Sequence, residues 1–352
     1  MLSTLQTKIL NNPNNNVFVE SAAASGKTAL LIEKTRQAIN DNKGPVVAFT
    51  FTNAAAEEIS QRLGDYDRNN VFIGTIHAYC CRLLLANGIT QALDYIEEQW
   101  FDQLFSLLRH HLECIKPIYF LLCDEMQDCN EEQFEFIFDL LKPEKRFMCY
   151  DKRQSIYRWR NAHPEYIDKY IDQTNGVIEY MNENYRNSQD ILMFAKSIIQ
   201  QAGYEYKDYS LAMRDIKGKV ITVDYSPVAI ARTIKRKGNY KDWFILTRTN
   251  DQVDEMMYFL EKEGVPCSSF KRAQLTNNEL YEKLQDDSVK VLTIHTSKGL
   301  EAPNVVVIGA RFYDLEEKCV SYVAATRARD LLVWAQIPTK PKRARTVNNW
   351  ER

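Results

Sequence analysis

One stretch of the sequence has the residue types and spacing of a phosphate-binding loop. It follows a short apolar run at residues 17–19 and leads into a helical pattern from residue 29. Backbone N–H groups of such a loop, together with the N-terminus of the following helix, attract an anion. Lys27 would add a positive charge, and the Thr28 hydroxyl could ligate Mg²⁺. The stretch consists of Ser21, Ala22, Ala23, Ala24, Ser25, Gly26, Lys27 and Thr28.

The match to the common Gly-x-x-x-x-Gly-Lys-Thr pattern is one residue short, because Ser21 stands in place of the first glycine. Taken alone, the stretch could also be a chance turn of small residues before a helix. The motifs that follow favour the nucleotide site.

A group of acidic residues forms the second motif. Asp124-Glu125-Met126-Gln127-Asp128 directly follows the apolar run at residues 120–123. Acids at the carboxyl end of a buried strand, beside the strand of the phosphate loop, suit Mg²⁺–nucleotide chemistry. Asp124 would hold Mg²⁺, and Glu125 would orient and deprotonate the attacking water. The alternative is a helix N-terminus that carries acids, which is common.

Hydrolysis of a phosphoanhydride also needs positive charge on the transferring group, worth roughly 10³–10⁵ in rate when an arginine supplies it. Arg186 and Arg327 are the candidates, although a lone arginine is usually a solvated surface residue. A further stretch, residues 154–160, interleaves aromatic residues with arginines. Aromatic faces stack on bases and arginines meet phosphates. The alternative is a helix whose Tyr and Trp side chains form a core stripe.

Composition and length limit the class of protein. The chain has 352 residues, enough for two ordinary domains, and its 45% hydrophobic and 26% charged residues are typical of a globular protein. No apolar run reaches the ~18 residues that a membrane span needs, and the polar N-terminus does not resemble a signal peptide. Eight cysteines without a Cys-x-x-Cys pair favour reduced thiols in the cytoplasm and indicate no zinc site. The net charge of −2 neither supports nor excludes a nucleic-acid partner.

Apolar, β-branched runs alternate with helical segments, which predicts an α/β fold of parallel sheets with helices on both faces. Two series of strands indicate two α/β units joined near residues 172–176. We expect an N-terminal domain over residues 1–175 with a helical insertion at about 84–118, a C-terminal domain over 176–340 and a basic tail at 341–352. The first series is Val17–Glu20, Val46–Thr50, Val71–Gly74, Tyr119–Cys123 and Phe147–Tyr150. The second is Val177–Tyr180, Val220–Val223, Trp243–Thr247, Val289–Ile294, Val305–Ile308 and Leu331–Trp334.

Taken in order, the motifs resemble the series found in UvrD/Rep/PcrA-like helicases of superfamily 1A. The resemblance covers nearly the whole chain, and eight motifs in the right order are far more specific than any one of them. They are Phe51-Thr52-Asn53, Gly74 to His77, Asp124 to Asp128, Gln154 to Arg160, Asn184-Tyr185-Arg186, Leu246 to Asn250, His295 to Glu301 and Ala325 to Arg329.

The resemblance implies two RecA-like P-loop domains with an ATP site in the cleft between them. Gln6 would read the adenine, Tyr185 would stack on it, and Glu301 would touch the ribose. Gln154 would sense the γ-phosphate, while Arg186 and Arg327 would act as arginine fingers. The residues implied to contact single-stranded DNA are Phe51, Asn53, His77, Tyr157, Trp159, Arg160 and His295. A lone histidine such as His77 or His295 is more often structural.

The resemblance therefore implies an ATP-dependent translocase or helicase on single-stranded DNA or a junction with duplex, moving 3′→5′ and using Mg²⁺. Relatives carry large accessory domains, called 1B and 2B, where this chain has only residues 83–119 and 251–288. We therefore expect a compact motor of limited processivity in the cytoplasm of a bacterial or phage-infected cell. The alternatives are a DNA-sensing NTPase subunit that licenses a partner, such as a nuclease or recombination factor, and a P-loop kinase or metabolic ATPase.

Overall fold

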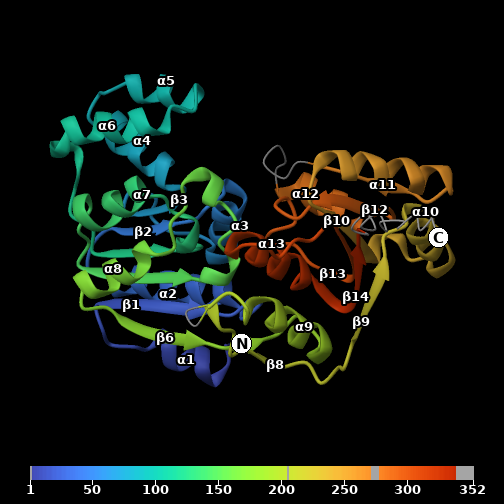
Figure 1. Cartoon of the computed structure of the whole chain (residues 1–352). Coiled ribbons are helices and arrows are strands. Elements are labelled where there is room, and N and C mark those ends of the chain that lie inside the picture. The colour runs from blue at the N-terminus through green and yellow to red at the C-terminus, as the bar shows by residue number, and fades with distance from the viewer. Residues whose placement is uncertain (1, 204–205, 271–276, 338–352) are drawn as a thin grey trace, which may run out of the picture.

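The structure is a computed structural model, and it describes residues 2–203, 206–270 and 277–337. Two lobes lie side by side, each built around one parallel sheet (Figure 1). Helices flank both sheets, so the predicted α/β class with parallel sheets is confirmed. The basic tail expected at residues 341–352 lies outside the described residues.

The first lobe contains the phosphate-loop stretch. Its strands are β1 (Asn16–Ser21), β2 (Val46–Phe49), β3 (Val71–Gly74), β4 (Phe120–Cys123), β5 (Lys145–Tyr150) and β6 (Val177–Met181). Its helices are α1 (Thr4–Leu10), α2 (Lys27–Asp41), α3 (Asn53–Leu63), α4 (Ile76–Ala86), α5 (Gln91–Glu97), α6 (Phe101–His110), α7 (Glu131–Glu135) and α8 (Tyr166–Gln173). Short helical turns are η1 (Leu112–Cys114), η2 (Met126–Asp128), η3 (Phe136–Leu140), η4 (Lys152–Gln154) and η5 (Arg158–Arg160).

The second lobe follows a short connection. Its sheet contains β9 (Lys219–Asp224), β10 (Trp243–Thr247), β11 (Cys267–Ser268), β12 (Val289–Thr293), β13 (Ala302–Ile308) and β14 (Ala328–Gln336). Its helices are α9 (Gln189–Ile199), α10 (Pro227–Lys237), η7 (Tyr240–Asp242), α11 (Asn250–Lys262), α12 (Asn277–Gln285) and α13 (Leu315–Ala325). Between the lobes, β7 (Glu183–Asn184) pairs with β8 (Leu211–Ala212).

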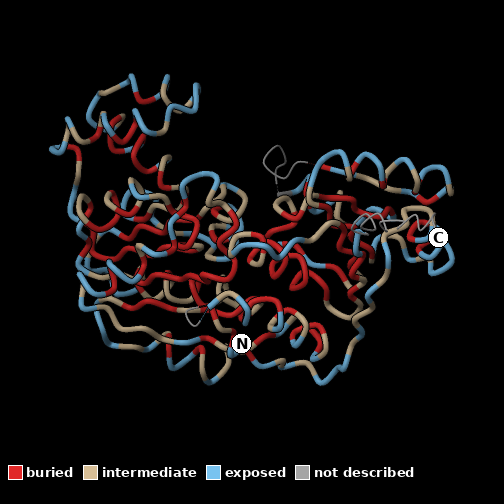
Figure 2. Tube along the Cα trace, in the orientation of Figure 1, coloured by how far each residue is buried: buried red, intermediate tan, exposed pale blue. Residues whose placement is uncertain are grey.

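Both sheets pack against hydrophobic clusters on their two faces. Side chains alternate between the faces along a strand, so one strand can contribute to two clusters. In β1, Val17 and Val19 pack with α2, whereas Phe18 packs into a cluster on the opposite face with residues of α4, α7 and α8. In β10, Phe244 and Ile245 likewise enter different clusters. Figure 2 shows the buried backbone concentrated in the strands of each lobe.

Strand order corrects two expectations. The first sheet runs β3-β2-β4-β5-β1-β6 and the second β11-β12-β10-β13-β14-β9. The prediction that Val177–Tyr180 opens the second series is wrong, because β6 pairs with β1 from Val17↔Val177 to Ser21↔Met181. The first sheet therefore extends past residue 175. The acidic strand β4 is also not beside the phosphate-loop strand β1, because β5 pairs with both and lies between them.

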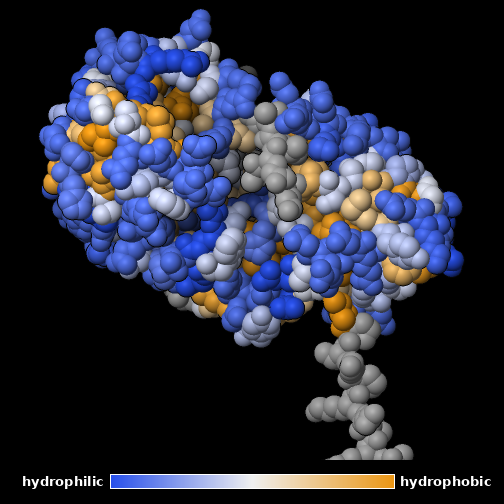
Figure 3. Space-filling model, turned by 90° about the horizontal axis from the view of Figure 1, so that it is seen from above, coloured by the Kyte–Doolittle hydropathy of each residue, from blue (hydrophilic) through white to orange (hydrophobic). Residues whose placement is uncertain are grey.

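A helical projection rises from the first lobe between β3 and β4, within the stretch expected to be a helical insertion (Figure 1). Phe105 and Leu108 of α6 pack against Cys80 and Leu84 of α4 in the core of the lobe. Viewed from above, Figure 3 shows hydrophobic atoms gathered at the end of the molecule that carries these helices. Leu93 and Leu112, each 52% exposed, are among the large apolar side chains here.

Candidate functional site

The phosphate-loop stretch forms the connection between β1 and α2. Gly26 has φ +82, a left-handed conformation, and a Cβ placed on it would lie 2.6 Å from Nε2 of Gln6. Only glycine therefore fits at this position. Ala24 also has a positive φ of 56, so the loop takes a glycine-like backbone at a position occupied by alanine. Gln6 is buried, and its Nε2 donates to the Ser25 carbonyl at 2.8 Å.

Other contacts fix the loop from the connection between the lobes. The Asn184 side chain donates to the Ala23 carbonyl at 2.9 Å, and the backbone N–H of Tyr185 donates to the Ala24 carbonyl at 3.0 Å. Tyr185 is 41% exposed at the mouth of the site. Both residues proposed to hold a base therefore contact the loop, and Tyr185 lines the cleft, whereas Gln6 is buried and is not among the residues that line it.

The acidic motif meets the loop through Lys27. Its Nζ lies 2.7 Å from Glu125 Oε1 and 3.7 Å from Asp124 Oδ1. Because β5 separates β4 from β1, roughly 10 Å of sheet lies between the two strands, and the long lysine side chain bridges it. Burial raises the pKa of Asp124 to about 6. Burial would also raise the pKa of Glu125, but Lys27 and Lys298 outweigh it and lower that pKa to about 2.

These residues fit a magnesium nucleotide. The loop lines the cleft and has a positive φ at Ala24 and Gly26, Lys27 supplies a buried cation, and Thr28 and Asp124 line the same cleft. Hydroxyl and carboxylate oxygens are the ligands that Mg²⁺ prefers. We therefore treat this loop and acidic motif as the candidate nucleotide site.

The second lobe contributes arginines to the same cleft. Arg327 is 2% exposed, and its Nη2 donates to the side-chain oxygen of Gln154 at 3.3 Å. Arg186 pairs with Glu301 through Nε and donates from Nη1 to the Thr326 carbonyl at 3.3 Å. All of these side chains except Thr326 line one cleft with the phosphate loop. The two candidate arginines therefore line the same cleft as the phosphate loop.

Aromatic side chains continue the cleft away from the phosphate loop. The rings of Phe51 and Tyr157 stack with centroids 5.1 Å apart, and the His295 ring lies 6.0 Å from that of Tyr157. Trp159 is 67% exposed next to this row, and the Arg160 guanidinium lies 5.7 Å from its ring centroid. The structure thus brings together a row of planar side chains on which bases can stack.

Asn53 and His77 lie along the same cleft. Asn53 is the exposed first residue of α3. The His77 ring stacks on Phe101 of the helical projection, with centroids 4.1 Å apart. Burial, reinforced by the charge of Arg160, lowers the pKa of His77 to about 4. His77 is therefore partly covered by protein. This burial supports the alternative that the histidine has a structural role.

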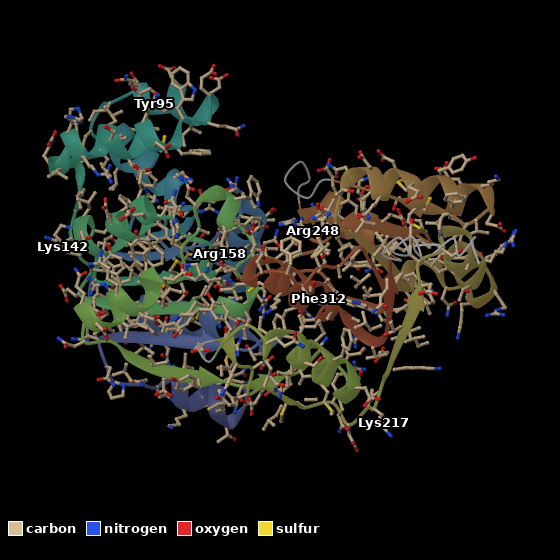
Figure 4. All side chains as sticks on the ribbon, in the orientation of Figure 1. Tyr95, Lys142, Arg158, Lys217, Arg248 and Phe312 are labelled. Atoms are coloured by element: carbon tan, nitrogen blue, oxygen red, sulfur yellow. The ribbon has the colours of Figure 1, made fainter. Side chains whose placement is uncertain are left out.

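The cleft has a volume of about 1890 Å³, and its lining includes phosphate-loop residues 22 and 24–28 and the aromatic row, apart from Trp159. Figure 4 shows Arg158 and Arg248 near the boundary between the lobes, one on each side. Arg248 is held by two contacts to Glu317, at 3.0 and 2.5 Å. Arg158 pairs with Glu165 and donates to the Tyr206 hydroxyl at 3.3 Å.

Two buried cations were missed by sequence reasoning. Lys298 contacts Asp128 across the lobes, and Arg153 pairs with Asp151 and lies 3.7 Å from Asp208. Lys298 stands inside the motif of residues 295–301, so its position in that motif was the available signal. No comparable signal marked the partner of Arg153, because Asp208 is distant in sequence.

The fold and cleft define a class: a two-lobed P-loop protein whose candidate nucleotide site lies in a cleft lined by residues of both lobes. Comparison with known families agrees. The UvrD/REP helicase N-terminal domain matches residues 2–113 and 109–175, and the UvrD-like helicase C-terminal domain matches residues 268–337. Together these matches cover more than half of the sequence, and the chain belongs to the UvrD/REP helicase family.

Sequence identity to three individual relatives lies between 24% and 29%. Gabija protein GajB of Bacillus cereus (strain VD045) is 26% identical over 301 residues, which cover 71% of this chain and 60% of that protein. A probable DNA helicase of Mycoplasma pneumoniae is 24% identical over 89% of this chain and 79% of its own length. ATP-dependent DNA helicase Rep of Escherichia coli (strain K12) is 29% identical over 77% of this chain and 44% of its own length. The chain thus spans between 44% and 79% of these three relatives. In the part of the chain that the structure describes, no helix is long and apolar enough to cross a bilayer.

Proposed function

We propose that this chain hydrolyses ATP and uses the cycle to move along single-stranded DNA, in the 3′→5′ direction that the family resemblance implies. The observation that carries the proposal is one continuous cleft that joins the phosphate loop, arginines of the opposite lobe and a row of aromatic side chains. A metabolic kinase would use the first two of these features but would not need the row of aromatic side chains.

The chemistry follows from the positions of the side chains. Lys27 and the loop N–H groups would hold the phosphates, and Gln6 and Tyr185 would hold the base. Glu125 would take a proton from a water whose oxygen attacks the γ-phosphorus, while the bond to the bridging oxygen breaks and ADP leaves. Arg186 and Arg327 would neutralise the charge that develops on the phosphoryl oxygens. Mg²⁺, held by Thr28 and Asp124, would add charge neutralisation when bound.

Movement requires the two lobes to grip the strand differently during the cycle. ATP contacted from both lobes would favour a closed cleft, and loss of the γ-phosphate would release it. Phe51, Tyr157 and Trp159 would stack on bases in the first lobe, and His295 would contact the strand from the second. A shift between the lobes would then carry one set of contacts past the other. We place this activity in the cytoplasm, with limited processivity because the described insertions are short.

The test is ATP hydrolysis titrated with single-stranded DNA, duplex DNA and single-stranded RNA at one stated salt concentration. We expect single-stranded DNA to stimulate turnover several-fold or more, and Glu125→Gln to abolish it. Glu98→Gln, a change at an exposed glutamate of the helical projection, is the matched control. Equal rates with and without nucleic acid would contradict the proposal. Displacement of streptavidin from the 3′ or the 5′ end of an oligonucleotide then reports direction.

A second candidate is a DNA-sensing NTPase subunit that licenses a protein partner. The chain is similar to Gabija protein GajB as well as to Rep, and this supports the DNA-sensing subunit as a second candidate. Exposed large apolar side chains of α9 and of the β8 segment also favour it, since Met193, Leu211 and Met213 are 68%, 60% and 48% exposed. Stable copurification with a second protein, together with DNA-stimulated hydrolysis and no streptavidin displacement, would support this candidate over the translocase.

A further inference from the structure

The Glu183 carboxylate joins the N-terminal helix to the aromatic ring proposed to stack on the base. Glu183 lies in β7, two residues before Tyr185. Its Oε2 accepts one hydrogen bond from the Tyr185 hydroxyl at 2.7 Å and another from the Ser3 hydroxyl at 2.5 Å. Bonds from a hydroxyl to a carboxylate are short and roughly twice as strong as bonds between neutral groups. The Tyr185 ring is therefore held at its hydroxyl as well as through its backbone.

Ser3 is itself fixed, because it is the N-cap of α1. Its Oγ accepts from the backbone N–H of Gln6 at 3.1 Å, and its own N–H donates to Gln6 Oε1 at 2.9 Å. The Gln6 Nε2 in turn donates to the Ser25 carbonyl in the phosphate loop. Ser3, Gln6 and the loop thus form one hydrogen-bonded unit, and Glu183 attaches the Tyr185 ring to it. The position of the ring relative to the phosphate loop follows from these bonds.

Tyr185 lies where such support affects binding. The side chain is 41% exposed and lines the cleft, whereas Ser3, Gln6 and Glu183 are not among the residues that line it. An exposed side chain that is free to rotate loses conformational entropy when a ligand fixes it, and affinity falls accordingly. A ring already held in one orientation avoids that loss. Glu183 would therefore act on a bound base through the ring and not by direct contact.

We propose that Glu183 is a positioning residue for base recognition, which holds the Tyr185 ring in the orientation that stacks on a nucleobase before the nucleotide binds. The inference deepens the proposed function and rests on its nucleotide site. A different interpretation is that Glu183 only fastens α1 to the connection between the lobes. The two interpretations differ in whether loss of Glu183 weakens a ligand that has a base more than one that has none.

The experiment is calorimetric titration of the full chain with two ligands, a nonhydrolysable ATP analogue and inorganic tripolyphosphate, which lacks the base and the ribose. Glu183→Ala removes the acceptor, and Tyr185→Phe removes the donor but keeps the ring. We expect either change to raise the Kd for the analogue by roughly three- to tenfold, the size usual for immobilising one side chain. The Kd for tripolyphosphate should stay at the wild-type value. Tyr185→Phe also tests the same bond if Glu183→Ala does not fold.

Glu179→Ala is the matched control. Glu179 lies in β6 and accepts from the Asn12 side chain at 2.6 Å, so it fastens the segment after α1. Within the described residues its hydrogen bond goes to Asn12 and not to Tyr185. We expect wild-type Kd values for both ligands in Glu179→Ala, because loosening the N-terminal segment alone should not release the ring.

Two further variants test whether the bond itself matters. Glu183→Gln keeps one acceptor oxygen and should restore most of the affinity for the ATP analogue. The double variant of Glu183→Ala with Tyr185→Phe should bind the analogue no more weakly than either single variant, because contacting residues act non-additively and both changes remove the same bond. Additive losses would contradict a shared role.

The outcomes separate the inference from the proposed function. A wild-type Kd for the analogue in folded Glu183→Ala would overturn the role of Glu183. An equal loss of affinity for the analogue and for tripolyphosphate, or the same loss in Glu179→Ala, would also overturn it, since either result describes a structural tie. Failure of wild type to bind the analogue would overturn both proposals. Binding by wild type without any DNA stimulation of hydrolysis would overturn only the proposed function.

Discussion

The Arg327 guanidinium donates a hydrogen bond to the side-chain oxygen of Gln154, 3.3 Å away, and so joins the second lobe to the first. The guanidinium also donates to the carbonyls of Val323 and Leu300, at 3.0 and 3.2 Å, and to the Thr326 hydroxyl at 3.1 Å. Burial, with the nearby charge of Arg186, lowers the pKa of Arg327 to about 9, so the group stays mainly protonated at neutral pH. A fixed, buried cation of the second lobe thus lines the same cleft as the phosphate loop.

The pairing of Lys27 with Glu125 leads to a first prediction. Lys27→Met should lower kcat for ATP hydrolysis by about 10²–10³, the loss typical when one preorganised charge donor is removed. Lys8→Met, at an exposed position of α1, should leave kcat unchanged. Steady-state hydrolysis at saturating ATP and single-stranded DNA measures both. Retention of wild-type turnover in Lys27→Met would show that the loop is not the catalytic nucleotide site.

Exposure of Trp159 gives a second prediction, on strand affinity. Trp159→Ala should weaken binding of an oligothymidylate by roughly 1–3 kcal/mol, the usual contribution of one base stacked on an aromatic ring. Trp100→Ala is the matched control, because Trp100 is also exposed, at 49%, but belongs to the helical projection. Fluorescence anisotropy gives both affinities. An equal loss in the two variants would argue against a strand track at Trp159.

The buried ion pairs of Arg153 lead to a prediction about the free energy of unfolding of the protein. Arg153 is 4% exposed, its Nε lies 2.6 Å from Asp151 Oδ1, and Nη1 lies 3.7 Å from Asp208 Oδ1. Arg153→Met leaves these carboxylates without their cation, which should lower the free energy of unfolding by about 3–5 kcal/mol. Arg232→Met removes an exposed pair with Glu263 and should cost about 0–1 kcal/mol. Urea denaturation compares the two, and similar losses would contradict the prediction.

The low pKa of His77 predicts a dependence of stability on pH. In the folded protein this pKa is lowered from 6.5 to about 4 by burial and by Arg160. Between these values the unfolded chain binds a proton at His77 and the folded protein does not, so this contribution to stability decreases as the pH falls from 6.5 to 4. His77→Gln removes the effect. Urea denaturation at several pH values should give a wild-type minus variant difference that changes only in this window, and a constant difference would contradict the account.

Sequence patterns predicted the strands well but not all of their neighbours. Each predicted strand is present within a few residues, because apolar β-branched runs report burial directly. The same pattern does not say which strand is the partner. The predicted strand Val177–Tyr180 was therefore assigned to the wrong sheet, and β5 was not expected between β1 and β4.

In the candidate site, too, the sequence predicted individual residues but not all of the contacts between distant segments. Lys27 and Glu125 were predicted from the motifs, and Arg327 from the family resemblance; the structure gathers all three in one cleft. Lys298 was missed because lysines in loops are usually solvated, and burial by a distant segment leaves no periodic signal. No sequence pattern predicted that Phe101 stacks on His77, because this contact depends on how the helical projection packs on α4.

The most direct test of a nucleotide site shared by the two lobes is single-turnover hydrolysis by Arg327→Gln at saturating ATP and single-stranded DNA. Arg236→Gln, at an exposed position of α10, is the control, and circular dichroism establishes that both variants are folded. The account predicts a rate constant lower by about 10³–10⁵ in Arg327→Gln, the usual contribution of an arginine finger. A folded Arg327→Gln that hydrolyses ATP at the wild-type rate would contradict it.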